Sequence, residues 1–328
     1  MKDHSDERST KSPNSSKENI PPSVGIRLFS SGSEDEKIGL DIVVIGDFAR
    51  DQLVYHGRRE TSSGGSVYYG AIALRRIGLR TAVITRLASN DFHHLEDLRR
   101  EGIIVYAQPA TQTSGIENVY TTENMDRRIC HLLGFAGQFD PKRIPRLSAH
   151  VFLVGPIMAG IVNLDLLREF SNMGNVALDA QGFVRVQKGD DFLLTDWPEK
   201  EKGLRLVKVL KVDDVESELL TGEKDRFKSI KRLASYGPSE IMLTHADGVM
   251  VYAEGNSYEA PFVPRKIVGR TGRGDTCFAT YLGKRLTSSP QEACRFAAAA
   301  TSLKLENPGP LSVSLEEVQR LAGTLVTR

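Results

Sequence analysis

The sequence predicts an α/β fold, with a doubly wound, mostly parallel central sheet flanked by helices and a small β lid. Short apolar runs recur along the chain, as in Asp41–Gly46 and Val176–Asp179, and such runs are typical of buried parallel strands. Segments with helical spacing separate these runs, which indicates crossover helices. Residues 112–134 break the alternation with two strand-like runs joined by a polar link, which predicts a hairpin.

Composition excludes several classes of protein. The chain has 328 residues, 40% of them hydrophobic, and a net charge of +1, so no global field favours nucleic acid or a membrane. No apolar run approaches the roughly 18 residues of a membrane span, and the N-terminus lacks a signal-peptide pattern. The three cysteines form no CxxC pair. We therefore expect a cytoplasmic protein with neither nucleic-acid nor membrane partners.

The chain divides into a tail and one domain. Residues 1–38 are rich in Ser, Pro and Lys and cannot bury enough surface to fold, so we expect a disordered tail. Residues 39–328 contain no convincing linker, which predicts a single domain. Segments near 52–63 and 112–134 are its expected lid.

The elements of this domain follow in order. The N-terminal half is expected to contain strands at Asp41–Gly46, Thr81–Leu87 and Ile103–Tyr106, helices at 64–78 and Asp91–Glu101, and the hairpin strands Ile116–Thr122 and Arg127–Leu133. Further strands are expected at Val151–Val154, Val176–Asp179, Val207–Val212, Glu240–Thr244 and Gly248–Tyr252, and helices at Leu164–Asn172, Asp214–Thr221 and Phe227–Tyr236. Ser289–Glu292 and Ser314–Glu317 have the pattern of capping boxes, which predicts two more helix starts.

The stretch Thr271–Thr276, with the sequence TGRGDT, is the most informative part of the chain. Its two glycines let the backbone approach a ligand closely, and the helix that follows begins with N–H groups that favour an anion. Asp275 is a carboxylate placed where the anion would bind. It either stabilises the helix dipole or removes a proton from a nucleophile that attacks a phosphate.

Three other groups of residues have a functional and a structural interpretation. Asp213 and Glu216 are three residues apart at a helix start, where they would position hydrated Mg²⁺ or form an acidic helix N-terminus. Asp51 follows the first strand, where α/β sheets bind ligands, but a loop cap is an equal alternative. Gly64-Gly65 permits close approach of a substrate or forms a simple turn.

These groups, in this order, resemble the ribokinase family, also called PfkB-type carbohydrate kinases. The family has a Gly-Gly pair near its N-terminus and Asp-Thr-x-Gly-Ala-Gly-Asp near its C-terminus. Here they correspond to Gly64-Gly65 and Arg270–Asp275. The resemblance covers about residues 40–324 and implies a ribokinase-like fold.

The resemblance assigns a role to each group. It implies that Asp275 is the catalytic base. The anion hole for the transferred phosphoryl group would be the backbone of Gly272, Arg273 and Gly274. The acceptor substrate would contact Asp51, Gly64 and Gly65. Mg²⁺, held through water, and the donor phosphates would be organised by Asp213 and Glu216. The nucleotide would lie along Thr244, Asp247 and Gly248, with its adenine near Asn307.

Four residues depart from the family pattern, and one of them is Asp213, which replaces the Asn of the family's Asn-x-x-Glu motif. Arg270 stands near an acidic position that helps some members to hold a monovalent cation, and a cation would be repelled there. Arg273 replaces a small residue in the anion hole, where it would either stabilise charge or face solvent. Tyr69 replaces a sugar-binding Asn, and Leu178–Arg185 resembles inositol-kinase-like members.

The sequence therefore predicts an ATP-dependent, Mg²⁺-requiring kinase that acts on a hydroxyl of a small sugar or polyol. A nucleoside kinase of the same fold and a catalytically silent ligand-binding or regulatory protein are the alternatives. Lid hairpins of this family often pair between subunits, so the resemblance implies a homodimer through the lid.

Overall fold

Two sheets organise the chain in the computed structural model, which describes residues 26–28, 39–55, 57–120, 128–189 and 191–327. The larger sheet has ten strands in the order β1-β6-β5-β2-β9-β10-β13-β14-β15-β16. Its strands are β1 Ile26–Leu28, β2 Leu40–Ile45, β5 Thr81–Ala88, β6 Ile104–Ala110, β9 Ala149–Val154, β10 Asn175–Asp179, β13 Val209–Asp213, β14 Glu240–Thr244, β15 Gly248–Ala253 and β16 Asn256–Pro261. All neighbouring strands from β1 to β14 are parallel, whereas β15 and β16 are antiparallel.

Helices cover both faces of this sheet, and alternate side chains of its strands point to opposite cores. In β2, Ile42 and Val44 pack with residues of the helices α1, α8 and α9, and Val43 and Ile45 pack with residues of α3 and α7. The helices are α1 Ser66–Arg76, α2 Glu96–Arg100, α3 Leu164–Met173, α4 Gln181–Val184, α5 Lys200–Leu204, α6 Asp214–Thr221, α7 Arg226–Ser235, α8 Arg273–Arg285, α9 Pro290–Leu305 and α10 Leu315–Ala322. The predicted mostly parallel, helix-flanked sheet is confirmed.

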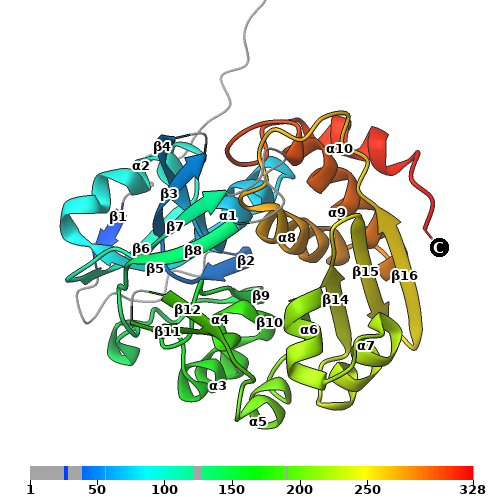
Figure 1. The fold of residues 1–328 in the computed structure, drawn as a ribbon, viewed down its shortest axis with the longest axis horizontal. Coiled ribbons are helices and arrows are strands. Elements are labelled where there is room, and N and C mark those ends of the chain that lie inside the picture. The colour runs from blue at the N-terminus through cyan, green and yellow to red at the C-terminus, as the bar shows by residue number, and fades with distance from the viewer. Residues whose placement is uncertain (1–25, 29–38, 56, 121–127, 190, 328) are drawn as a thin grey trace, which may run out of the picture.

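The smaller sheet has six strands in the order β11-β12-β8-β7-β3-β4. They are β3 Ala49–Tyr55, β4 Arg58–Gly64, β7 Gly115–Tyr120, β8 Arg128–Gly134, β11 Arg185–Lys188 and β12 Asp191–Leu194. The predicted hairpin is confirmed, because β7 and β8 pair antiparallel. In Figure 1 this sheet lies on the left, and α6, α7 and β14–β16 lie on the right.

Two sequence predictions need correction. Ile26–Leu28 lies in the segment expected to be disordered but pairs parallel to β6 as an edge strand, whereas residues 1–25 and 29–38 lie outside the described residues. The helix expected at Asp91–Glu101 is divided into a 3₁₀ segment, Ser89–Leu95, and the short helix α2. Two consecutive histidines and an aromatic residue occupy the 3₁₀ segment, and none of them favours a continuous α-helix.

The predicted helix starts near the C-terminus are confirmed. Ser289 and Ser314 each accept a hydrogen bond from the backbone N–H of a glutamate three residues later, and each glutamate bonds back to the serine N–H. These capping boxes fix the starts of α9 and α10. Across the described residues, no helix combines the length and apolar character needed to cross a membrane.

Candidate active site

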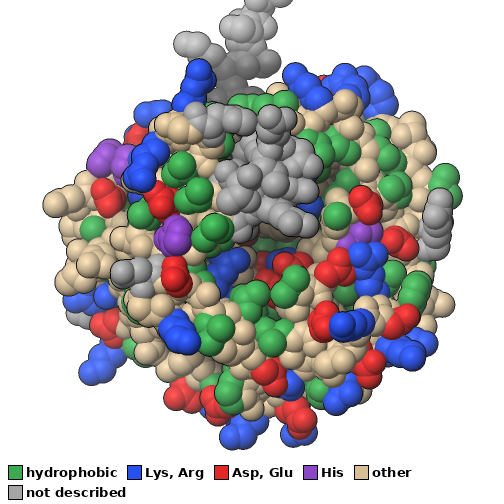
Figure 2. All heavy atoms as spheres, in the orientation of Figure 1, with side chains coloured by type: hydrophobic (Ala, Val, Ile, Leu, Met, Phe, Trp, Pro, Cys, Tyr) green, Lys and Arg blue, Asp and Glu red, His purple; other side chains and the backbone are tan. Residues whose placement is uncertain are grey.

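A cavity of about 310 Å³ opens where loops follow the C-terminal ends of the central strands. Ligands bind at this edge in open α/β sheets. Figure 2 shows the hollow near the middle of the face, with acidic and basic side chains in and around it. Eight residues predicted from the sequence line it: Asp51, Gly65, Asp213, Thr244, Gly272, Arg273, Gly274 and Asp275.

The turn before α8 exposes the N-terminus of this helix to the cavity. Gly272 is the N-cap residue and has a left-handed conformation (φ 77°). An added Cβ there would lie 2.2 Å from ring carbons of Tyr69, so the position requires glycine. The N–H of Arg273 donates to the carbonyl of Arg270 at 3.2 Å. The backbone N–H groups of Gly274 and Asp275 find no acceptor within the described part of the chain, so these two N–H groups are free to bind an anion.

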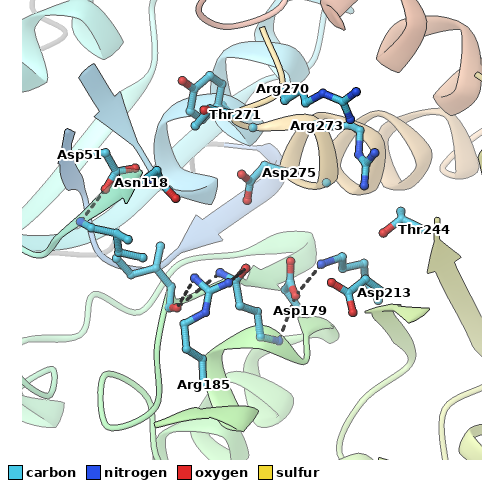
Figure 3. A pocket seen from close by; sticks show the side chains of 18 residues that line it. Asp51, Asn118, Asp179, Arg185, Asp213, Thr244, Arg270, Thr271, Arg273 and Asp275 are labelled. Atoms are coloured by element: carbon cyan, nitrogen blue, oxygen red, sulfur yellow. Dashed lines mark hydrogen bonds and ion pairs between the residues drawn. The ribbon is translucent and has the colours of Figure 1, made fainter. Parts of the chain in front are cut away.

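Asp275 lies inside this cavity and does not cap its own helix. Its Oδ1 accepts a hydrogen bond of 2.5 Å from the Ser66 hydroxyl, at the start of α1. Desolvation raises the pKa of Asp275, and the Ser66 hydrogen bond partly offsets this rise. Figure 3 shows the carboxylate between Asp51 and Asn118 on one side and Thr244 and Asp213 on the other. A carboxylate in this position can accept a proton from a hydroxyl bound on one side.

Asp51 and the glycine pair form the first part of the acceptor side. The N–H of Ile116 donates to Asp51 Oδ1 at 2.9 Å, which fixes the carboxylate against β7. A Cβ at Gly64 would lie 2.5 Å from Asp51 Oδ2, and one at Gly65 would lie 2.6 Å from the carbonyl oxygen of Asp47. Gly65 also has a φ of 84°. Both glycines are therefore required by close packing, although Gly64 itself does not line the cavity.

Three polar residues on the acceptor side were not predicted from the sequence. Asn118 on β7 is buried and lines the cavity. Arg185 donates to the side-chain oxygen of Gln181 at 3.0 Å, and its guanidinium lies 5.8 Å from the ring centroid of Phe192 in β12. Arg185 is the first residue of β11, so the smaller sheet itself contributes this side chain to the cavity wall. Together these groups offer hydrogen-bond donors and acceptors to a polyhydroxylated ligand.

On the donor side, Asp213 and Glu216 form the capping box of α6. Asp213 Oδ1 accepts from the N–H of Glu216, and Glu216 Oε2 accepts from the N–H of Asp213, each at 2.8 Å. Asp213 is thus the N-cap of α6 and also lines the cavity, where its role in positioning hydrated Mg²⁺ stays a prediction. Glu216 is buried beneath it and does not line the cavity.

Lys211 is a buried cation between these acids, and the sequence prediction missed it. Its Nζ lies 3.1 Å from Asp179 Oδ1 and 3.6 Å from Glu216 Oε2. Burial lowers the pKa of Lys211, but the neighbouring carboxylates of Asp179, Glu216 and Asp213 reverse this effect and raise it overall. The ammonium therefore stays charged and faces the start of α8, where a Cβ on Gly274 would lie 3.6 Å from it.

The donor side could hold a hydrated magnesium ion. Asp179 and Asp213 line the cavity, and within the described residues the Oδ2 atom of each has no hydrogen-bonding partner. No group of three or more His, Cys, Asp or Glu suited to direct coordination occurs in the described chain. Mg²⁺ usually keeps several waters and uses only one or two carboxylates, so this pair fits the ion.

The residues expected along a nucleotide are only partly brought to the cavity. Thr244, at the end of β14, lines it, and so do Arg270 and Arg273. The lining, as far as the chain is described, does not include the three other expected nucleotide residues, Asp247, Gly248 and Asn307. Asp247 is exposed at the β14–β15 turn. In Figure 3 both arginines lie on the side of Asp275 away from Asp51.

Comparison with known proteins identifies the family. The model of pfkB family carbohydrate kinases matches residues 36–317. The chain belongs to the pfkB family of carbohydrate kinases. The expected family membership and kinase class are thereby confirmed for this pfkB kinase. Among curated proteins, none matches the chain.

Several of the solved structures that resemble this pfkB kinase are pyrophosphate-dependent kinases. A pyrophosphate-dependent kinase of the ribokinase family, complexed with a pyrophosphate analog and myo-inositol, is 36% identical, with a TM-score of 0.77 over 85% of this chain and 99% of the other. A pyrophosphate-dependent myo-inositol-1 kinase converted into a myo-inositol-3 kinase is 35% identical, with a TM-score of 0.78 over 86% and 98%. Ribokinase of Arabidopsis thaliana, with ribose and ATP, is 19% identical (TM-score 0.69 over 87% and 99%) and supports the fold alone.

Proposed function

We propose that this kinase transfers a phosphoryl group from a magnesium-bound polyphosphate to a hydroxyl of a small cyclic polyol, with Asp275 as the base. One observation carries the proposal. The carboxylate of Asp275 lies between an acceptor side that contains Asp51 and an α8 N-terminus with free N–H groups. A hydroxyl and a phosphoryl group bound on these two sides would meet at Asp275.

Each part of the site contributes to the transfer. Asp275 takes the proton as the hydroxyl oxygen forms a bond to the terminal phosphorus of the donor, and Ser66 holds the carboxylate by donating to its Oδ1. The bond between that phosphorus and the bridging oxygen breaks, and the rest of the donor leaves as ADP or phosphate. The N–H groups of Gly274 and Asp275 stabilise charge on the phosphoryl oxygens, with the fixed charge of Lys211 nearby. Asp179 and Asp213 would hold Mg²⁺ through water, and the ion would neutralise charge on the donor phosphates.

The acceptor is proposed to be a neutral polyol of the inositol class. Asp51 supplies a carboxylate, Asn118 and Gln181 supply amides, and Arg185 supplies a guanidinium. Such a set can pair with several neighbouring hydroxyls of one ring. Two relatives support this choice: a 36% identical kinase was solved with myo-inositol, and a 35% identical protein is a myo-inositol kinase.

The donor has two candidates. ATP follows from the sequence resemblance, and pyrophosphate is favoured by a specific observation. Arg270, Arg273 and Lys211 line the cavity, whereas Asp247 and Asn307 do not line it within the described chain. A cation-rich wall suits a compact polyanion that needs no base pocket. The description of the relatives as pyrophosphate-dependent also supports this second candidate.

A panel of donors and acceptors tests the proposal. ATP and pyrophosphate, each with Mg²⁺, would be combined with inositols, aldoses, ketoses and nucleosides, and phosphorylated product would be measured by mass spectrometry. We expect turnover with an inositol and at least one donor. Turnover with nucleosides alone would contradict the polyol assignment and identify a nucleoside kinase. Saturable binding of a polyol without turnover under any donor would overturn the kinase mechanism and favour a ligand sensor.

A further inference from the structure

Lys304 is a second buried cation beside the site, separate from Lys211. It lies in the last turn of α9 and is only 1% exposed. Its Nζ donates to the carbonyl of Gly269 at 2.8 Å and lies 5.5 Å from the ring centroid of Tyr69. Electrostatic attraction also links it to Asp275.

The ammonium of Lys304 is poorly compensated for a buried charge. Within the described residues no carboxylate lies within 4 Å of it, and the carbonyl of Gly269 is its one hydrogen-bond acceptor. Lys211, by contrast, has two carboxylates at its ammonium. A buried charge without an ionic partner is costly for the stability of the fold. A role in stability therefore does not explain why Lys304 occupies this position.

Both contacts of Lys304 lead to the same loop, residues 269–272. Gly269 begins this loop, and Lys304 holds its carbonyl. Gly272 ends the loop and packs on the ring of Tyr69, so closely that a Cβ would overlap it. The ring of Tyr69 thus supports the end of the loop and lies beside the ammonium that holds its start.

We propose that Lys304 is a positioning residue that fixes the loop 269–272 and, when protonated, places a positive charge behind the anion site at the start of α8. This inference rests on the proposed phosphoryl transfer. The loop carries Arg270 and Thr271 into the cavity and sets the direction of the free N–H groups that follow it. Without the ammonium, the carbonyl of Gly269 loses its donor and the anion site loses a nearby charge.

The experiment compares Lys304→Met, Lys304→Arg and Lys304→Ala with a matched control, Lys284→Met. Lys284 lies on α8 and also contacts an aromatic ring, Phe296, at 5.6 Å, but it does not line this cavity. For each protein we would measure kcat, KM, the Kd of pyrophosphate by calorimetry, and Tm. Lys304→Ala would also be assayed with ammonium chloride, and with tetramethylammonium chloride as the salt control.

The proposal predicts that Lys304→Met loses about tenfold or more in kcat and in affinity for pyrophosphate while its Tm stays at or above the wild-type value. Losses of this size are expected when the reacting groups are displaced by a small distance from their productive geometry. We expect Lys304→Arg to retain more activity, ammonium to restore part of the activity of Lys304→Ala, and Lys284→Met to behave as wild type.

Two results would overturn the proposal. In the first, Lys304→Met keeps kcat and pyrophosphate affinity within twofold of wild type. In the second, its Tm falls together with activity and ammonium restores none, which would make Lys304 a structural support. Absence of turnover in the wild type would instead contradict the proposed function. The pyrophosphate Kd would still decide the role of Lys304.

Discussion

The hydroxyl of Ser66 donates a 2.5 Å hydrogen bond to Oδ1 of Asp275, joining the first residue of α1 to the first turn of α8 across 209 positions of sequence. This bond occupies one oxygen of the carboxylate and orients the other. It also favours the ionised form of Asp275 against the burial that raises the pKa. The two helices therefore hold the proposed base jointly.

Ser66→Ala should shift the acidic limb of the pH–rate profile upward. Loss of the hydrogen bond raises the pKa of Asp275 further, and only the ionised carboxylate can accept the proton. Hydrogen bonds to charged groups contribute about 1.5–3 kcal/mol, so we expect a shift of about one pH unit or more. The profile of kcat/KM checks this, with Ser171→Ala on α3 as control. An unchanged acidic limb would show that Asp275 is not the group that titrates.

Gly272→Ala should abolish most activity, whereas Gly274→Ala should fold normally. At Gly272 the φ of 77° disfavours a side chain, and the Cβ would overlap Tyr69. At Gly274 the Cβ would be in ordinary contact, 3.6 Å from Lys211. We expect Gly272→Ala to lose about 1–3 kcal/mol of stability, measured by urea denaturation. Equal behaviour of both variants would contradict the close approach of Tyr69.

Much of the fold could be predicted because its signal is local. Buried parallel strands such as β2 and β14 are nearly continuous apolar runs. Capping boxes place Ser and Glu three residues apart, so they are visible in the sequence as well. The strands β11 and β12 have four residues each and are mostly exposed, so neither length nor periodicity revealed them. The edge strand β1 has only three residues, which is too short to show a periodic pattern.

The candidate site was predictable only where its residues form a motif. Asp275 and Asp213 lie in recognisable stretches, and the structure brings them to one cavity. Lys211 is a single lysine inside a strand, a pattern that usually indicates a solvent-facing residue. Ser66 is part of the site because its hydroxyl bonds to Asp275 on α8, and no local sequence pattern indicates that contact. Pairings of this kind depend on tertiary structure and have no signature in one sequence.

Asp51→Asn should weaken binding of the polyol more than it slows transfer. The amide oxygen can still accept from the N–H of Ile116, so the loop is expected to stay in place. Loss of the negative charge weakens hydrogen bonds from substrate hydroxyls, and we expect KM for the polyol to rise about tenfold or more. Asp191→Asn on β12, which removes a surface pair with His131, is the control. An unchanged KM would remove Asp51 from the acceptor site.

Lys304 should make stability depend on pH above neutrality. Burial lowers its pKa from 10.5 to about 8, with Asp275 opposing the shift. Between these two values the unfolded chain binds more protons than the folded one, so the free energy of unfolding rises with pH across this window. Below pH 8 both states become protonated and this contribution levels off. The change corresponds to about 3 kcal/mol.

Denaturation of wild type and Lys304→Met at pH 7, 8, 9 and 10 measures this contribution. The stability of the wild type relative to the variant should increase with pH, because methionine does not titrate. Lys304→Arg should show no such increase, since arginine stays charged. If the free energy of unfolding varied with pH in the same way for wild type and Lys304→Met, the lowered pKa of Lys304 would be contradicted.

The most direct test of the central claim is the turnover of Asp275→Asn with the best donor and polyol, measured together with donor affinity. We predict that kcat falls by about two orders of magnitude or more, the scale for removal of a general base. Donor Kd should stay within a few-fold of wild type and Tm should not fall, because burial already disfavours the charge of Asp275. Turnover near the wild-type rate in a correctly folded Asp275→Asn variant would contradict the assignment of Asp275 as the base.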